Sequence, residues 1–365
     1  MPPISIMIKP ASSLCNMKCD YCFYHDVAEH RLEQSFGIMK EETSFELIDK
    51  ALQYTKGDSV FFAFQGGEPC LAELQFFKSF TAYVRKVNTK CSRVYYSLQT
   101  NGTLLDENWA RFLKQENFLV GLSFDGDYKS NCHRKKSNGD NAYYKILQAL
   151  ELLQRFDVQF NILTVLTGEC AENIENIYNF FKEKGCKYLQ FIPCLRPYGD
   201  KQEDPLYMTA QQYENFLIRL FQMYVKDYVR DNYISIRQFD NMVRLFLGQP
   251  TEQCGMMGHC TFQYAVEANG NIYPCDFYCT DEWLLGNIHN TDFQELHNIE
   301  KAKKFIKDSL YVNEKCKQCK FYVMCRGGGC KRNKEDRDYC SSYYNFFSTS
   351  YPLFRVFLGE KPNTY

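Results

Sequence analysis

The chain has 365 residues, a formal net charge of −1, 45% hydrophobic residues and 18 cysteines. This composition excludes a disordered chain and a short secreted disulfide scaffold, and no run of about 18 apolar residues is present to cross a bilayer. Because the N-terminus lacks the basic and apolar segments of a signal peptide, we expect a cytoplasmic protein with no membrane or nucleic-acid partner, whose cysteines bind metal or carry out thiol chemistry.

Up to about residue 240, short apolar runs rich in β-branched and aromatic residues alternate with amphipathic stretches. This alternation predicts parallel strands joined by helices, in an α/β fold of the partial (β/α)6 TIM-like barrel type with its chemistry at the carboxyl ends of the strands. The predicted strands are 4–8, 60–64, 93–98, 119–123, 159–166, 188–192 and 235–237. The predicted helices are 41–55, 71–87, 107–115, 143–156, 171–183 and 210–229.

Three cysteines follow the first predicted strand in a C-x3-C-x2-C pattern, at Cys15, Cys19 and Cys22. Three thiolates on one loop can hold an iron–sulfur cube and leave its fourth iron open to another ligand. A zinc knuckle completed by His25 or His30, or three unrelated buried cysteines, remains the alternative.

Small polar residues and glycines follow three of the next strands. Gly66 and Gly67 come directly after strand 60–64, and glycines there let the backbone approach a ligand closely, although most such pairs form ordinary turns. The segments 99–102 and 123–126 are Gln-Thr-Asn-Gly and Ser-Phe-Asp-Gly. We expect these strand ends to line one cleft.

The alternation stops after about residue 250, and nine cysteines fall between Cys254 and Cys340. The region is rich in loop residues, with a predicted hairpin at 264–273 that turns at Asn269 and Gly270. Such a segment has little core of its own, so metal crosslinks are expected to hold it together. A pair of zinc sites is the alternative to iron–sulfur clusters, because C-x2-C is a common zinc spacing.

The pattern Cys15-x3-Cys19-x-Tyr21-Cys22, followed by Gly66-Gly67-Glu68-Pro69, resembles the signature of the radical S-adenosylmethionine (radical SAM) superfamily. The resemblance implies that the open iron of a [4Fe–4S] cluster chelates S-adenosylmethionine, from which a 5′-deoxyadenosyl radical is produced. The resemblance also places residues that contact S-adenosylmethionine at Tyr21, Gly67, Ser123, Arg134 and Leu195.

The C-terminal cysteines resemble the SPASM region of radical enzymes that modify peptides, which carries two auxiliary [4Fe–4S] clusters. The resemblance implies three clusters in all. It assigns one auxiliary set of ligands to Cys254, Cys260, Cys275 and Cys330. It assigns the other set to Cys316, Cys319, Cys325 and Cys340. Four residues rather than the family's three separate Cys325 from Cys330, which leaves Cys279 as a substitute for Cys330. The seven cysteines left over are expected to be small buried packing residues: Cys70, Cys91, Cys132, Cys170, Cys186, Cys194 and Cys279.

Over essentially its whole length the chain resembles the anaerobic sulfatase-maturating enzymes, notably in residues 8–13, 21–25, 62–69, 97–103 and 273–278. The resemblance implies oxidation of a cysteine or serine to Cα-formylglycine in an unfolded or nascent sulfatase polypeptide, within a C/S-x-P/A-x-R motif. The radical would remove a Cβ hydrogen, Asp276 would act as the base, and an auxiliary cluster would accept the second electron. Reduced ferredoxin or flavodoxin is the expected electron donor.

Three alternatives remain open at this point. A SPASM-type maturase that crosslinks or epimerises another peptide would share nearly every motif. An iron–sulfur electron carrier or a zinc-stabilised binding module would not cleave S-adenosylmethionine. We expect two domains, a radical SAM barrel at 1–240 and a SPASM domain at 241–365. Tyr24, Gln65 and Arg237 are candidates for lining the peptide groove.

Overall fold

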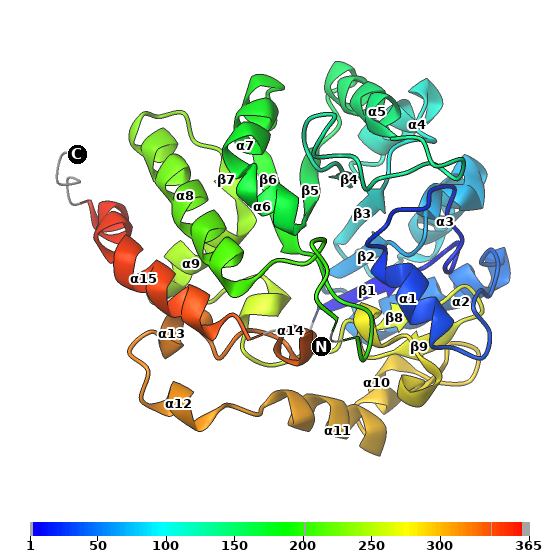
Figure 1. Cartoon of the computed structure of the whole chain (residues 1–365). Helices are drawn as coiled ribbons and strands as arrows, with labels where there is room; N and C mark the ends of the chain where they lie inside the picture. The colour runs from blue at the N-terminus through cyan, green and yellow to red at the C-terminus, as the bar shows by residue number, and fades with distance from the viewer. Residues whose placement is uncertain (1–2, 201, 337, 360–365) are drawn as a thin grey trace. The chain divides into compact units, whose positions relative to one another are not determined.

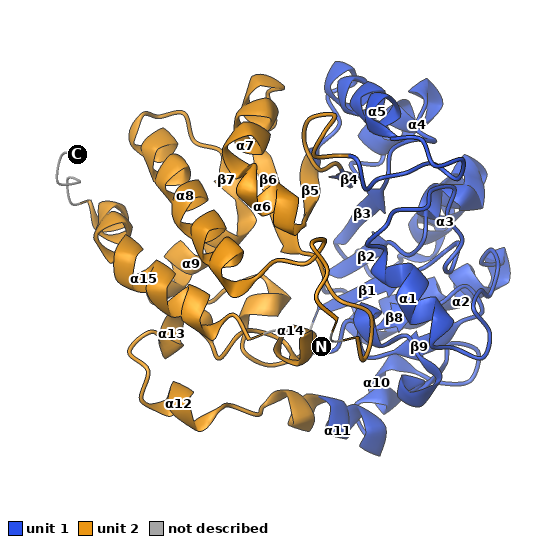
Figure 2. Cartoon of the chain, in the orientation of Figure 1, with its two compact units in different colours: residues 1–123, 132–160, 262–305 blue, residues 124–131, 161–261, 306–365 orange. Residues whose placement is uncertain are grey.

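The computed structural model describes residues 3–200, 202–336 and 338–359. The chain forms two compact units, each built from segments that are far apart in the sequence (Figure 2). Unit 1 consists of residues 1–123, 132–160 and 262–305. Unit 2 consists of residues 124–131, 161–261 and 306–365.

Four parallel strands form the centre of unit 1. They are β1 (Ile4–Ile8), β2 (Val60–Phe64), β3 (Val94–Thr100) and β4 (Leu119–Ser123), and each pairs with the next in sequence order. Alternate residues of β1 and β2 are fully buried, which is the period of two that a strand requires. The predicted strands and the predicted α/β class are confirmed, with β3 starting one residue later and ending two residues later than expected.

Helices join these strands, as parallel pairing requires. They are α1 (Phe23–Glu29), α2 (Glu41–Thr55), the 3-10 turn η1 (Pro69–Ala72), α3 (Glu73–Val87), α4 (Glu107–Gln115) and α5 (Tyr143–Arg155). Helix α4 begins where predicted because Asp106 caps it, accepting the Trp109 N–H at 2.9 Å. The aromatic residues of α3 pack against Phe62 and Phe64 of β2.

The second edge of unit 1 comes from the cysteine-rich part of the chain. Strand β8 (Ala265–Val266) pairs parallel to β1, with Met7 opposite Ala265. Strands β9 (Asn271–Tyr273) and β10 (Gly286–Asn287) extend this edge in antiparallel pairs. The predicted hairpin is confirmed, and Gly270 makes its turn with a φ of 85°. The turns η3 (Asp276–Tyr278) and η4 (Asp281–Trp283) and helix α10 (Phe293–Leu296) complete this part.

Unit 2 has three parallel strands, β5 (Phe160–Leu166), β6 (Tyr188–Pro193) and β7 (Ser235–Ile236). Its helices here are α6 (Gly168–Glu172), α7 (Ile174–Glu183), α8 (Ala210–Val229) and α9 (Arg237–Phe246). The helix predicted at 171–183 is interrupted at Asn173, so α6 and α7 are separate. A full capping box at Thr209 and Gln212 starts α8 at the predicted residue.

The last part of unit 2 is a series of short turns followed by one long helix. The short elements are η2 (Cys254–Met256), the end of α11 (Glu300–Ser309), α12 (Glu314–Lys317), α13 (Tyr322–Cys325) and α14 (Lys331–Asp336). The long helix, α15 (Cys340–Phe354), lies along α8 (Figure 1) and is followed by the turn η5 (Arg355–Leu358). Among the described residues, no helix is both long and apolar enough to cross a membrane.

Candidate active site and metal-binding cysteines

The loop that carries Cys15, Cys19 and Cys22 follows β1 and ends at the start of α1. Its backbone pairs with the segment before α5, since the Lys18 N–H bonds to the Lys135 carbonyl at 2.8 Å and the Asp20 N–H to the His133 carbonyl at 3.0 Å. Burial raises the pKa of the Cys15 thiol, and the charges of the nearby Cys22 and Cys19 thiols raise it further. The structure therefore brings the three predicted thiols together on one supported loop.

The two glycines after β2 allow this loop to pass directly over the end of the strand. A Cβ on Gly67 would lie 2.1 Å from the Leu14 carbonyl oxygen, and a Cβ on Gly66 would lie 2.7 Å from that of Ser12. The Gly67 and Glu68 N–H groups bond to those same carbonyls, Ser12 at 2.9 Å and Leu14 at 2.7 Å. Any side chain at Gly67 would displace the cysteine loop.

Glu68 connects this turn to the end of β3. It is buried, and its carboxylate accepts the N–H groups of Cys70 and Asn101 at 3.0 and 2.8 Å and the Thr100 hydroxyl at 2.8 Å. Burial raises the pKa of Glu68, and these donors oppose that rise by stabilising the charged form. The Asn101 amide in turn reaches the Cys15 sulfur at 3.9 Å.

The residues predicted to contact S-adenosylmethionine are divided between the two units. In unit 1, the Arg134 guanidinium is buried and lies 5.5 Å from the centre of the Tyr21 ring, while the Ser123 hydroxyl accepts a hydrogen bond from the Gln99 amide at 2.9 Å. Gly67 belongs to the same unit. Leu195 lies in unit 2, on the loop that follows β6.

Asp276 is part of a set of buried charges in unit 1. Its Oδ1 lies 2.9 Å from the Lys9 Nζ, and Lys9 also lies 3.6 Å from the Glu267 carboxylate. Arg31 donates to Glu267 at 2.7 Å. Burial disfavours the Lys9 ammonium, but Asp276, Cys279 and Glu267 outweigh that effect and raise the pKa of Lys9 above its usual value. We call these four side chains, Lys9, Arg31, Glu267 and Asp276, the buried charge set.

Two further polar side chains meet Asp276. The Tyr24 hydroxyl donates to the Asp276 Oδ2 at 2.7 Å and lies 3.3 Å from the Gln65 Oε1. Burial, followed by the charge of Asp276, raises the pKa of Tyr24, so the phenol is neutral and acts as a donor. Tyr24 and Gln65, both suggested as groove residues, thus lie beside Asp276. Arg237 lies in unit 2, where it donates to the Gln190 side chain at 3.0 Å.

Three of the four cysteines predicted for the first auxiliary set belong to unit 2 and lie close together there. Cys254 and Cys260 both act electrostatically on the Cys330 thiol, whose pKa rises to about 11 mainly because it is buried. The Lys331 N–H points at the Cys260 sulfur at 3.4 Å. The fourth member, Cys275, belongs to unit 1.

The extra residue between Cys325 and Cys330 is absorbed by a run of glycines. Gly327, Gly328 and Gly329 have φ values of 72°, 91° and 93°, a region that favours glycine. Cys279, the substitute considered for Cys330, is fully buried in unit 1, where its thiol donates to the Cys275 carbonyl at 3.6 Å and lies near Lys9. Burial raises the pKa of Cys279 to about 12.

The second auxiliary set lies entirely in unit 2 and lines one cavity of about 380 Å³. The lining includes all four predicted thiols, those of Cys316, Cys319, Cys325 and Cys340. Aromatic side chains form much of the remaining wall: Phe321, Tyr322, Tyr343, Tyr344 and Phe347. The Lys315 ammonium at the cavity lies 3.1 Å from the Asp338 carboxylate.

The donors gathered at these sites are thiols. Three on the first loop and four lining the unit 2 cavity are the ligand type and number that [4Fe–4S] cubes take. His25 and His30, the proposed zinc partners, lie beside Glu29 and Asp26.

Five of the seven leftover cysteines are buried, as expected: Cys70, Cys170, Cys186, Cys194 and Cys279. The prediction was wrong for two. Cys91 is exposed because it lies in a turn after α3 with a φ of 55°, and Cys132 is only half buried on the loop before α5.

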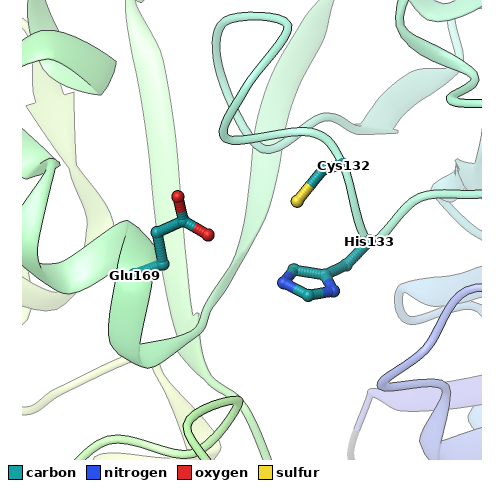
Figure 3. Close-up of side chains that lie close together, drawn as sticks. All are labelled: Cys132, His133 and Glu169. Atoms are coloured by element: carbon teal, nitrogen blue, oxygen red, sulfur yellow. The ribbon is translucent and has the colours of Figure 1, made fainter.

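Figure 3 shows Cys132 beside His133, together with Glu169 at the start of α6 in unit 2. His133 and Glu169 each have a partner in their own unit. The His133 Nδ1 lies 2.9 Å from Asp20, and the Glu169 carboxylate lies 3.1 Å from the Lys129 Nζ.

Sequence reasoning missed the buried charge set apart from Asp276. Lys9 and Glu267 each follow directly after a short apolar strand, at the strand ends where barrel chemistry is expected. A charged residue directly after an apolar strand was the feature of the sequence that could have identified Lys9 and Glu267. Arg31 gave no comparable signal, since it lies in a loop after α1.

Two family models match the sequence. The model described as the radical SAM superfamily covers residues 10–181, and the one described as an iron–sulfur cluster-binding domain (SPASM) covers residues 254–320. The first match includes Cys15, Cys19 and Cys22. The second includes five of the eight predicted auxiliary ligands: Cys254, Cys260, Cys275, Cys316 and Cys319.

Comparison with known proteins gives matches over nearly the whole chain. A cysteine-type anaerobic sulfatase-maturating enzyme from Clostridium perfringens is 45% identical over 361 residues, covering 96% of this chain and 97% of the relative. A serine-type enzyme from Bacteroides thetaiotaomicron is 29% identical, covering 99% of this chain and 92% of the relative.

Solved structures give the same result. The structure described as native anSMEcpe with bound AdoMet and Cp18Cys peptide matches with a TM-score of 0.92 and 43% identity, over 99% of this chain and 100% of that one. Streptococcus suis SuiB bound to its precursor peptide matches with a TM-score of 0.63 and 17% identity, covering 91% of this chain and 72% of that one, and so shares the fold.

Proposed function

Because the chain belongs to the anaerobic sulfatase-maturating enzymes, radical SAM enzymes that carry an iron–sulfur cluster-binding SPASM domain, we propose that it oxidises a cysteine of a sulfatase precursor to Cα-formylglycine. S-adenosylmethionine and [4Fe–4S] clusters, the cofactors expected from the sequence, are those of this family. The observation that supports the proposal best is the buried carboxylate of Asp276, fixed by Lys9 and Tyr24 and adjacent in sequence to Cys275.

The predicted ligands are part of the proposal. Cys15, Cys19 and Cys22 hold the first cluster, and Tyr21, Gly67, Ser123, Arg134 and Leu195 contact S-adenosylmethionine. Cys254, Cys260, Cys275 and Cys330 hold one auxiliary cluster, and Cys316, Cys319, Cys325 and Cys340 hold the other. The division into a radical SAM part at 1–240 and a SPASM part at 241–365 belongs to the same proposal.

The cofactors, when bound, supply a carbon-centred radical that removes a hydrogen from the target Cβ and a one-electron acceptor for the electron left behind. Asp276 takes the proton from the thiol of the target residue at its carboxylate oxygens. The loss of that proton, the Cβ hydrogen and one electron leaves a thioaldehyde, which water hydrolyses to the aldehyde of formylglycine with release of hydrogen sulfide. A general base must lie within hydrogen-bond reach of its proton and have little competition from water. Asp276 meets the second condition, since its side chain is only 9% exposed.

The neighbours of Asp276 hold the carboxylate in place. Lys9 balances its charge at Oδ1, and Tyr24 bonds to Oδ2, so the carboxylate cannot rotate freely. Gln65 has its side-chain oxygen 3.3 Å from the Tyr24 hydroxyl. Tyr24 and Gln65 therefore position the target residue next to the base.

The proposed substrate is an unfolded or nascent sulfatase polypeptide with a C-x-P/A-x-R motif. The support for cysteine over serine as the target is the identity to cysteine-type relatives, 45% against 29% for the serine-type enzyme. The solved relative with bound AdoMet and Cp18Cys peptide supports a peptide ligand. A reduced ferredoxin or flavodoxin serves as the electron donor.

The test is anaerobic incubation of the reconstituted enzyme with S-adenosylmethionine, a reductant and two peptides that differ only in a cysteine or serine at the target position. We expect formylglycine, seen by mass spectrometry as the mass loss at that residue, with the cysteine peptide converted faster. Formation of 5′-deoxyadenosine without any change at the target residue would contradict the proposed substrate. Equal conversion of both peptides would contradict the preference for cysteine.

A further inference from the structure

The loop after β6 carries Leu195, the residue of unit 2 proposed to contact S-adenosylmethionine. Residues 194–198 have no helical or strand structure of their own. Parallel strands place their ligand contacts on the loops at their carboxyl ends, so the position of this loop matters for cofactor binding. Something outside the loop must therefore fix its backbone.

Two side chains of α14 bind the backbone of Arg196, one at its N–H and the other at its carbonyl. The Asp336 Oδ1 accepts the Arg196 N–H at 2.9 Å, and the Arg332 guanidinium donates to the Arg196 carbonyl. Arg332 and Asp336 also lie 3.8 Å apart, with only 6% and 4% of their side chains exposed. The Arg332 guanidinium lies 4.4 Å from the centre of the Tyr198 ring. We call Arg332 and Asp336 the α14 clamp.

Helix α14 begins directly after Cys330, a predicted ligand of the first auxiliary set. The Lys331 N–H points at the Cys260 sulfur at 3.4 Å, and the backbone amides of Arg332 and Asn333 favour the thiolate form of Cys330, which lowers its pKa against the effect of burial. A helix of six residues is not stable alone, because helix nucleation is costly and short helices depend on tertiary contacts. The first turn of α14 is thus ordered through the sulfur atoms of two predicted ligands.

If Arg332 served only to pack α14 against its neighbours, a single contact would be enough. Here a nearly buried arginine and a nearly buried aspartate instead hold both hydrogen-bonding groups of a single residue, next to Leu195. Burying two charges for this purpose is costly unless each is well paired. The arrangement gives a continuous path of bonded groups from Cys330 through α14 to Arg196.

We propose that the α14 clamp couples the occupancy of the first auxiliary site to the affinity for S-adenosylmethionine, with Arg332 and Asp336 acting as positioning residues for the Leu195 loop. This inference rests on the proposed function, in which Cys330 is a cluster ligand and Leu195 contacts the cofactor. A cluster bound at Cys254, Cys260 and Cys330 orders α14, and the ordered clamp then holds residues 194–198 in the binding conformation.

The first test is the dissociation constant of S-adenosylmethionine, measured by equilibrium binding to anaerobically reconstituted enzyme without peptide. Arg332→Met and Asp336→Ala each remove bonds to Arg196, and we expect each to weaken binding about tenfold with the iron content unchanged. Glu335→Ala is the matched control, because Glu335 lies on the same helix but pairs with Lys331 at 2.9 Å. Affinities within twofold of the parent enzyme in both clamp variants would overturn the inference, as would an equal loss in the control.

The second test measures the order of the loop itself, and its result does not depend on whether the clamp variants bind iron. Hydrogen–deuterium exchange of the segment 194–200 is compared between the parent enzyme and the full-length Cys330→Ala variant. We expect the Arg196 amide to exchange at least tenfold faster in the variant, since its acceptor Asp336 is no longer held. Equal protection of this amide in both proteins would overturn the coupling. Neither test uses the sulfatase peptide, so a failure of the proposed substrate leaves both results interpretable.

Discussion

At the scale of single residues, the buried charge set explains how a carboxylate can be kept ready beside a cluster ligand. Lys9 and Arg31 supply two positive charges, and Glu267 and Asp276 supply two negative ones. The set is balanced, so each charge is buried with a partner of opposite sign, which is the condition under which buried ions are tolerated. Removing the Lys9 charge leaves the nearly buried Asp276 carboxylate without its cation.

Asp276→Asn is expected to retain iron and the cleavage of S-adenosylmethionine but to lose at least a hundredfold in formylglycine formation, in line with the usual contribution of a general base. The asparagine side chain still fills the site but accepts no proton. The measurement is the ratio of formylglycine to 5′-deoxyadenosine in the same reaction. Glu282→Gln, which neutralises an exposed carboxylate, is the control. A ratio unchanged from the parent enzyme would remove Asp276 from the role of base.

Lys9→Met is expected to lower the free energy of unfolding by about 3–5 kcal/mol, because Asp276 and Glu267 lose their shared cation. Since the pKa of Lys9 is raised by folding, its contribution is complete below about pH 10.4, the unfolded value, and is lost only as the pH rises through the folded value. The loss should therefore be the same at pH 6 and pH 8 in anaerobic chemical denaturation. Lys86→Met, on the exposed face of α3, should change stability by less than about 0.5 kcal/mol.

At the scale of elements, the glycine run before Cys330 shows how a spacing that departs from the family pattern can still place its thiol. All three glycines adopt positive φ, but only Gly329 is in a confined position. A Cβ on Gly329 would lie 2.1 Å from the Gly255 carbonyl oxygen, whereas the nearest atom to a Cβ on Gly328 is 3.9 Å away. Because residues 255 and 329 approach each other closely, the neighbouring Cys254 and Cys330 lie near one another, as shared ligands of the first auxiliary cluster must.

Gly329→Ala is therefore expected to lose about a third of the bound iron, that of one cluster in three, because the backbone must move away from Gly255. Gly328→Ala has nearly the same φ and so the same backbone strain, but it should keep its iron. Iron analysis after anaerobic reconstitution distinguishes the two variants. Equal iron in both would show that the separation of residues 255 and 329 does not control this site.

The sequence predicted the elements of the first 240 residues well, since β-branched runs and capping residues such as Asp106 and Thr209 define them locally. The misses have physical causes. Strand β8 lies in the predicted hairpin, but its pairing with β1, about 260 positions earlier, has no local pattern to mark it. Helix α15 contains Pro352 and many aromatic residues, which lowers its helical signal, and its packing on α8 stabilises it instead. The three thiols of the first set follow from spacing, but the partners of Asp276 depend on tertiary packing.

At the scale of the whole molecule, we expect the cysteine-rich segments of unit 2 to depend on bound iron for their order. Within the described residues 254–260, 310–336 and 338–339, every helix has six residues or fewer. Their predicted ligands therefore replace the apolar core that longer elements would provide. By contrast, β1 to β4 of unit 1 bury alternate aromatic and aliphatic side chains and need no metal.

Removing iron with a chelator is expected to raise hydrogen–deuterium exchange across 254–260 and 310–340 while leaving 60–64 and 94–98 protected. Exchange monitored by mass spectrometry before and after chelation gives both results in one experiment. Uniform loss of protection in all four segments would mean that the strands too require the metal.

The pairing of β1 with β8 also has a consequence for biosynthesis. Strand β1 leaves the ribosome about 260 residues before strand β8, so the edge that β8 will cover lies open until Ala265 and Val266 have been made. At about 5–20 residues per second, that delay is roughly 13–50 s. During this time an unpaired strand edge next to the loop of Cys15, Cys19 and Cys22 is accessible in the nascent chain, so a chaperone that covers exposed strand edges would raise the yield of active enzyme.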